Sequence, residues 1–135
     1  MNSRRPPFRL RLDLHSGVPV YRQIVDQVHG GVASGTLSVG DQLPTVRQLA
    51  VDLSINPNTV ARAYRELELG GLLETHQGTG TFISTQKMRG GEEQRARQLS
   101  QIVGDFVARA GAAGFTVQNL IEELRELVAE PTRRR

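Results

Sequence analysis

Residues 42–80 constrain the fold most strongly, because they contain two short amphipathic helices, each with its own start signal, followed by a glycine-rich turn. The first helix is predicted to begin after Thr45, whose hydroxyl can accept a hydrogen bond from the backbone N–H three residues on. Gln48 is expected to reach back and complete a capping box. Apolar residues follow at the spacing of one buried helical face: Val46, Leu49, Ala50 and Leu53. This helix should therefore pack on a core and leave Arg47 pointing outward.

A three-residue break at 54–56 separates this helix from a second one. Asn56 is the expected N-cap and Pro57 the first helical residue, where a missing N–H costs nothing, and Gly70 marks the end. One side of the helix is apolar and the other polar and partly cationic, with Val60, Ala63, Tyr64 and Leu67 opposite Asn58, Arg62 and Arg65. Such a pair matches a helix-turn-helix, in which the start of the second helix meets base edges of DNA. An ordinary helical hairpin is the alternative.

Two strand-like runs, residues 72–75 and 81–84, surround a glycine-rich tip at 76–80. A hairpin that follows a helix-turn-helix makes a winged helix. Backbone N–H groups at such a tip can reach phosphates, and Gln77 or His76 could enter the adjacent minor groove. A simple turn is the alternative, whereas a nucleotide-binding loop would need a strand before and a helix after the glycines.

Five motifs in order between residues 8 and 84 resemble those of the GntR family of bacterial winged-helix transcription regulators. They are PVYRQI at 19–24, LPTVRQLA at 43–50, NPNTV at 56–60, YRELE at 64–68 and GTGTF at 78–82. The start of the second helix and the short C-terminal segment resemble the YtrA-type branch. The resemblance implies DNA contacts at Arg47, at the start of the second helix and at the wing tip.

The second helix departs from the better-known family pattern, because Pro57 and Ala61 occupy positions that often carry arginine. Base recognition should then depend on fewer groups. By geometry, Asn58 can pair bidentately with adenine, Arg62 can meet guanine or phosphate, and Thr59 can meet phosphate. The predicted DNA-binding set is Thr45, Arg47, Asn58, Thr59, Arg62, Arg65, Gln77, Gly78, Thr79 and Gly80.

The net charge of +3 by itself gives little support for nucleic-acid binding, because seven of the 17 basic residues lie in residues 4–11 and 133–135. The remaining ten face all 14 acidic residues. DNA binding is therefore predicted from architecture, with the N-terminal arm either tracking phosphates or solvated and disordered. No apolar run approaches a membrane span or a signal peptide, which indicates a cytoplasmic protein.

No enzymatic chemistry is predicted. The chain has no cysteine, and its histidines, His15, His29 and His76, are scattered over a strand region, a helix and a hairpin tip. Residues 85–135 contain no histidine, so the histidine and aspartate metal site of some larger GntR-type proteins is not expected. The sequence therefore predicts no metal site and no cofactor.

The segment before the helix-turn-helix contains an alternating run and a helix. Residues 8–14 alternate apolar and charged side chains, which predicts a half-buried strand that pairs with the wing or with a partner. A helical stripe follows between residues 18 and 34, with Pro19 at its start. Gly30 and Gly31 lie inside this helix, where each costs about 1 kcal/mol relative to alanine, so either fraying or close packing is expected there.

A second module follows the polar linker at residues 85–91. Two amphipathic helices, the second capped by Thr116, carry too few apolar residues to close a core alone. We expect them to pair with a second copy in a helical bundle, although packing on the winged helix of the same chain is an alternative. A small-molecule effector could bind between the protomers. The predicted dimerisation residues are Leu99, Ile102, Val103, Phe106, Leu120, Ile121, Leu124 and Leu127.

The predicted fold is mainly α with a small β-hairpin wing (α+β), a winged helix-turn-helix followed by a two-helix segment. The boundaries are a basic arm at 1–7, a DNA-binding domain at 8–84, a linker at 85–91, a dimerisation or effector segment at 92–131 and a basic tail at 132–135. The predicted function is a transcription regulator, most simply a repressor, that binds a two-fold double-stranded DNA operator as a homodimer. A winged helix that recognises RNA or a protein partner is the alternative.

Overall fold

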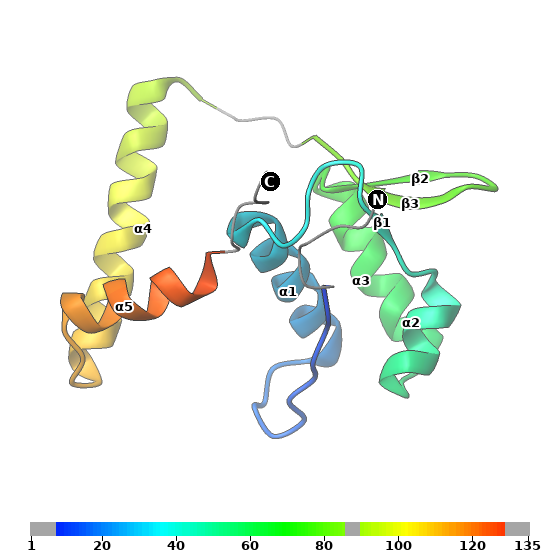
Figure 1. Ribbon diagram of the computed structural model, residues 1–135, viewed down its shortest axis with the longest axis horizontal. Helices are drawn as coiled ribbons and strands as arrows, with labels where there is room; N and C mark the ends of the chain where they lie inside the picture. The colour runs from blue at the N-terminus through cyan, green and yellow to red at the C-terminus, as the bar shows by residue number, and fades with distance from the viewer. Residues whose placement is uncertain (1–7, 86–89, 129–135) are drawn as a thin grey trace, which may run out of the picture. The chain divides into compact units, whose positions relative to one another are not determined.

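The computed structural model describes residues 8–85 and 90–128, and the chain divides into two compact units (Figure 1). The first unit contains α1 to β3 and the second contains α4 and α5. The predicted basic arm at 1–7, the linker residues 86–89 and the basic tail lie outside the described residues. Each unit is therefore described by itself.

Three helices build the core of the first unit: α1 (Val20–Ser34), α2 (Val46–Leu53) and α3 (Pro57–Leu69). Helix α3 packs against both α1 and α2. The predicted apolar side of α3 is buried, as is the side of α1 that faces it, and the largest fully buried side chains are Ile24, Val28, Val60, Leu67 and Leu72. Because one side of α3 is held in this core, its polar side is left on the surface.

A small antiparallel sheet completes the unit: β1 (Gln42–Leu43), β2 (Leu73–His76) and β3 (Gly80–Ile83), in the order β1-β3-β2 (Figure 1). The hairpin of β2 and β3 is the predicted wing, and its register pairs His76 with Gly80 at the tip. Strand β1 was not predicted, since two residues are too short for an alternating pattern. The predicted fold class, mainly α with a β wing, is confirmed.

The helix caps at Thr45 and Asn56 form as the sequence predicts, except for one side-chain hydrogen bond. Thr45 Oγ1 accepts the backbone N–H of Gln48 at 3.0 Å, and Asn56 Oδ1 accepts that of Asn58 at 2.7 Å. The reciprocal half of the predicted capping box is wrong, because the Gln48 amide donates forward to Asp52 Oδ1 at 2.9 Å. Side chains four residues apart lie on the same face of a helix, so Gln48 bonds Asp52 in place of the backbone N–H of Thr45.

The predicted strand at residues 8–14 is wrong. The segment has no strand assignment, and its backbone is bonded by two glutamine side chains of α1. Gln27 Oε1 accepts the Arg11 N–H at 2.9 Å while its amide donates to the Arg11 carbonyl. Gln23, which is buried, makes the same pair of bonds with Asp13, at 2.8 and 2.9 Å. These amides satisfy the backbone groups that a neighbouring strand would otherwise satisfy.

The two helical glycines of α1 have different surroundings. A Cβ on Gly31 would lie 2.8 Å from Phe8 Cε1 and 2.9 Å from Leu37 Cδ1, whereas a Cβ on Gly30 would meet nothing within 4 Å. Close packing, one of the two expected reasons for this pair, therefore applies to Gly31. The glycine lets the N-terminal segment and the turn after α1 approach the helix.

Gly30→Ala is expected to raise the free energy of unfolding by about 0.5 to 1 kcal/mol, because alanine is the better helix former and the site is open. Gly31→Ala, one residue away, is the matched control. Its free energy of unfolding should be at least about 1 kcal/mol lower than that of Gly30→Ala, because the new methyl overpacks Phe8 and Leu37. Urea unfolding of both variants measures the difference. Equal stabilisation by the two substitutions would contradict the packing role of Gly31.

The second unit consists of α4 (Glu92–Ala112) and α5 (Val117–Leu127), which contact each other. Thr116 caps α5 as predicted, and a full capping box with Asn119 is present. Neither helix has a buried residue within its described part, and the large apolar side chains are mostly exposed. No helix among the described residues is long and apolar enough to cross a membrane.

Candidate nucleic-acid interface

The polar side of α3 places three predicted DNA-contacting side chains on the surface. Asn58 lies in the first turn, and Arg62 and Arg65 follow in the next two turns, all of them exposed. Asn56 fixes the start of the helix by accepting the Asn58 N–H, while Thr59 is half-buried and donates its N–H to the Asn56 carbonyl at 3.0 Å. The first turn is therefore rigidly held, with the Asn58 amide free to meet an acceptor and donor pair on a base edge.

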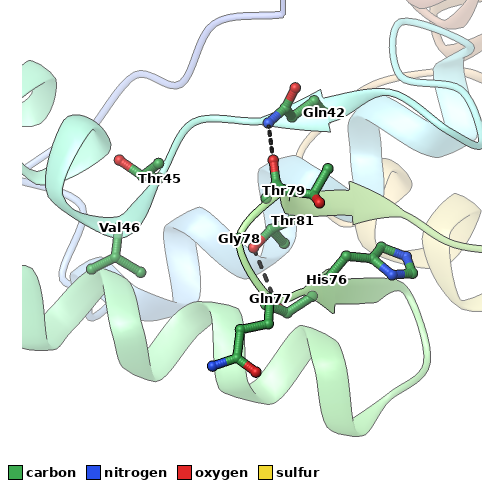
Figure 2. A pocket seen from close by; sticks show the side chains of 10 residues that line it. Gln42, Thr45, Val46, His76, Gln77, Gly78, Thr79 and Thr81 are labelled. Carbon is green, nitrogen blue, oxygen red and sulfur yellow. Dashed lines mark hydrogen bonds between the residues drawn. The ribbon is translucent and has the colours of Figure 1, made fainter.

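The wing tip and the start of α2 line one open pocket of about 440 Å³ (Figure 2). The structure thus brings Thr45 together with the predicted tip residues Gln77, Gly78, Thr79 and Gly80. Gly78 adopts φ of 80° and Gly80 of 137°, backbone conformations that side chains disfavour. Apart from Val46, the lining consists of glycines and of residues with hydrogen-bonding side chains, and it contains no aspartate, glutamate, lysine or arginine.

Gln42 ties the wing tip to the segment before α2. Its side-chain amide donates to the Thr79 carbonyl at 3.1 Å, and Figure 2 marks this bond with a dashed line. A Cβ on Gly80 would meet the same amide, and the φ of 137° at Gly80 independently disfavours a side chain there. The sequence did not indicate this role of Gln42, because the two partners are 37 residues apart.

The N-terminal turn of α1 contacts the outer side of α3, which the sequence also did not indicate. The guanidinium carbon of Arg62 lies 3.7 Å from the centroid of the Tyr21 ring. Arg22 donates to Glu66 Oε2 at 2.9 Å and lies 3.8 Å from Asp26. Contact with the Tyr21 side chain, together with the Glu66 carboxylate, raises the pKa of Arg22. Arg62 is therefore exposed, as predicted, but it is stacked on an aromatic ring.

The outer face of the wing carries an exposed hydrogen-bonded group around Glu74. This carboxylate accepts from Ser84 Oγ at 2.7 Å and lies 3.1 Å from His76 Nε2. The Ser84 hydroxyl, with a smaller contribution from His76, lowers the pKa of Glu74. The His76 ring also packs against Phe82, with 5.6 Å between ring centroids. These contacts direct His76 along the strand, while Gln77 occupies the tip.

A buried tyrosine connects α3 to the entrance of α2. Tyr64 Oη donates to the Pro44 carbonyl at 2.7 Å, and burial raises the pKa of this hydroxyl, so it remains a neutral donor. The bond positions the residue before the Thr45 cap. The placement of α2 and its outward Arg47 therefore depends on a side chain from α3.

Tyr64→Phe is expected to lower the free energy of unfolding by about 1 to 2 kcal/mol, because the partly buried Pro44 carbonyl loses its donor. Urea denaturation followed by circular dichroism measures the loss. Tyr21→Phe is the control, since that ring is only half-buried and the substitution should cost less. If the two substitutions cost the same, the Tyr64 hydroxyl does not hold α2 in place.

Within residues 8–85 and 90–128 there is no group of three or more histidine, aspartate or glutamate side chains placed to hold a metal ion. The predicted DNA-contacting groups of the first unit are instead amides, hydroxyls, guanidinium groups and glycine backbone. They lie on the elements with which a winged helix meets DNA: α2, α3 and the wing.

A model of the bacterial regulatory proteins of the gntR family matches residues 20–83, which include every element of the first unit. The HTH-type transcriptional repressor YtrA of Bacillus subtilis (strain 168) is 38% identical over 121 residues, which cover 90% of this chain and 93% of that protein. The chain belongs to the GntR family. It is a transcriptional regulator of this family with a DNA-binding domain.

Solved structures agree with this assignment. YtrA from Sulfolobus acidocaldarius, a GntR-family transcription factor, superimposes with a TM-score of 0.56 at 31% identity, covering 73% of this chain and 97% of that one. A transcriptional antiterminator from Listeria monocytogenes EGD-e gives a TM-score of 0.70 at 24% identity, covering 94% and 98%, and so shares the fold. The predicted resemblance of this GntR-family chain to the YtrA type is confirmed.

Proposed function

We propose that this GntR-family protein binds a two-fold operator in double-stranded DNA as a homodimer and acts in the cytoplasm as a repressor. The observation that carries the proposal is the exposed polar side of α3, which stands on a helix whose opposite side is core. A helix of this kind presents its N-terminal side chains to the major groove. The repressor sign rests on the similarity to YtrA of Bacillus subtilis, which is named as a transcriptional repressor.

The predicted contacts divide by the chemistry of their side chains. Asn58 would read adenine through its amide, and Arg62 would meet guanine or phosphate. Phosphate contacts fall to groups that carry no base information: Thr45, Arg47, Thr59, Arg65, Gly78, Thr79 and Gly80. Gln77 at the wing tip would enter the minor groove. The open pocket between α2 and the wing supports this division, because a phosphate there would meet hydroxyls and glycine backbone.

The proposed dimer forms through the apolar side of α4 and α5. Seven predicted residues on this side are exposed and one, Leu120, is half-buried: Leu99, Ile102, Val103, Phe106, Leu120, Ile121, Leu124 and Leu127. Two helices cannot bury these side chains against each other alone, so the area left over favours association with the same helices of a second copy. The dimer would match the two-fold symmetry of an operator.

An effector is a further part of the proposed function. A small molecule that binds between the protomers would change the relative placement of the two DNA-binding domains. The half-site spacing that the dimer can span would change with it, and a coupling of about 1 to 3 kcal/mol is enough to release an operator.

Selection of bound duplexes from a random pool, repeated at two salt concentrations, tests the proposed function. We expect a two-fold motif with half-sites about one helical turn apart. Affinity for this motif should fall with salt while its base preferences persist. A pool that stays random while binding disappears with salt would contradict sequence-specific recognition and favour a winged helix that binds RNA or protein.

Arg47→Ala is expected to weaken binding to all duplexes, because the proposal assigns Arg47 to a phosphate, which carries no base information. The slope of the logarithm of affinity against the logarithm of salt concentration should fall by about one unit. Arg109→Ala removes the same charge from α4, which is not among the elements proposed to contact DNA, and is the control. An unchanged slope in Arg47→Ala would remove this residue from the phosphate contacts.

A further inference from the structure

Tyr21 and Arg62 form a stack that joins α1 to the DNA-facing side of α3. The guanidinium carbon of Arg62 lies 3.7 Å from the centre of the Tyr21 ring, well within the distance of about 6 Å at which cation–π attraction acts. Tyr21 is half-buried and partly packed against the core, whereas Arg62 is exposed. A ring fixed by packing therefore restricts the movement of a long, otherwise flexible side chain.

The two arginines near the Tyr21 ring differ in their ion pairs. Arg22, 5.6 Å from the ring centre, is paired with Glu66 and Asp26. Arg62 forms no ion pair with any carboxylate in the described part of the chain. Its charge is not neutralised locally, and its N–H groups have no acceptor of the same protein among those residues. The contact with the ring therefore leaves these N–H groups available to a partner outside the chain.

We propose that Tyr21 is a positioning residue for base recognition, which holds the Arg62 guanidinium so that its N–H edge pairs with the O6 and N7 of a guanine in the major groove. The inference rests on the proposed function and names the base that this helix turn would read. A planar fork fixed in one plane matches the two acceptors of guanine, whereas a freely rotating one must first be ordered. Asn58, one turn earlier, would read the neighbouring adenine.

A double-mutant cycle on the selected operator tests the proposal, with parent, Tyr21→Leu, Arg62→Met and the double variant. Tyr21→Leu should weaken binding by about two- to fivefold, equivalent to about 0.5 to 1 kcal/mol, and should cost nothing further when Arg62 is already methionine. Tyr21→Phe keeps the ring and should restore most of the affinity. Tyr21→Leu combined with Arg47→Ala on α2 is the additive control.

Two further measurements separate positioning from mere support of the fold. An operator with 7-deazaguanine lacks the N7 acceptor but keeps every phosphate; it should weaken the parent and leave Arg62→Met unchanged. Phenylalanine with an increasing number of ring fluorines at position 21 keeps the ring shape while the attraction for a cation falls. Operator affinity should fall along that series at a constant unfolding midpoint, which keeps the test valid even if Tyr21→Leu folds poorly.

Three results would overturn the proposal. Additive losses in the cycle would mean that Tyr21 does not act through Arg62. Tighter binding by Tyr21→Leu would mean that the stack withholds Arg62 from DNA. Equal binding of the parent to guanine and 7-deazaguanine operators would mean that Arg62 contacts a phosphate and not the N7 of guanine. In all three cases a parent that still selects one motif leaves the proposed function intact, whereas a parent that selects none removes both.

Discussion

Replacing both Ile102 and Phe106 by aspartate is expected to give monomers and to weaken operator binding by about 10²- to 10⁴-fold. Their side chains are 57% and 44% exposed on α4, the surface that the proposed dimer would bury. Two charges at the centre of an apolar interface would remain desolvated and unpaired, so the bundle should dissociate. Each DNA-binding domain would then meet its half-site alone and lose the effective concentration that a tethered partner provides.

Sedimentation gives the mass of the protein, and titration of a two-fold operator gives the affinity. Gln101→Asp with Ala108→Asp is the matched control, because it adds two aspartates to the opposite side of the same helix. This control should remain dimeric and bind as the parent does. If Ile102→Asp with Phe106→Asp also sediments as a dimer, the apolar side of α4 is not the interface.

Asn58→Ala should remove the preference for adenine at one base pair of each half-site, reducing discrimination by about 1 to 3 kcal/mol. The amide lies exposed in the first turn of α3 and presents a donor and an acceptor in one plane. Alanine offers neither group, so the variant should accept all four base pairs there. Affinities for operators with each base pair at every position measure the change, with the other positions as internal references.

Asn56→Ala is the companion variant to Asn58→Ala, two residues away. Asn56 caps α3 by accepting the N–H of Asn58, so its loss should cost about 0.5 to 2 kcal/mol of stability. The base preferences of the folded protein should not change. Binding of Asn58→Ala to all operator variants with the affinities of the parent would show that direct base recognition lies elsewhere.

Local patterns predicted most of the fold of the first unit. The cap at Asn56 and the glycines after α3 set the bounds of that helix, and its apolar spacing identified the buried side correctly. The glycine-rich tip between two strand-like runs predicted the hairpin of the wing. These features depend on residues within about one helical turn or one hairpin of each other, and so the sequence carries them directly.

Features that depend on distant partners could not be predicted in the same way. Residues 8–14 have the alternation of a strand, but the pattern does not say whether a strand or two side-chain amides will bond the backbone. Strand β1 exists only because β3 lies beside it. The stack of Tyr21 on Arg62 joins residues 41 apart, and no periodicity relates them. The predicted site was therefore a set of exposed groups without the contacts that orient them.

The hydrogen bonds of Gln23 and Gln27 to residues 11 and 13 affect which positions of this segment tolerate substitution. Four residues of a helix advance about 6 Å and two residues of an extended chain about 6.6 Å, so the two spacings match closely. Toward residues 11 and 13, Gln23 and Gln27 bond only main-chain groups, which every residue except proline provides in full. The exposed side chains of Arg9 and Arg11 can therefore change without loosening the segment, whereas Asp13 Oδ1 accepts the His15 N–H at 3.0 Å. Related chains can alter the charge at positions 9 and 11, provided that they keep the two amides.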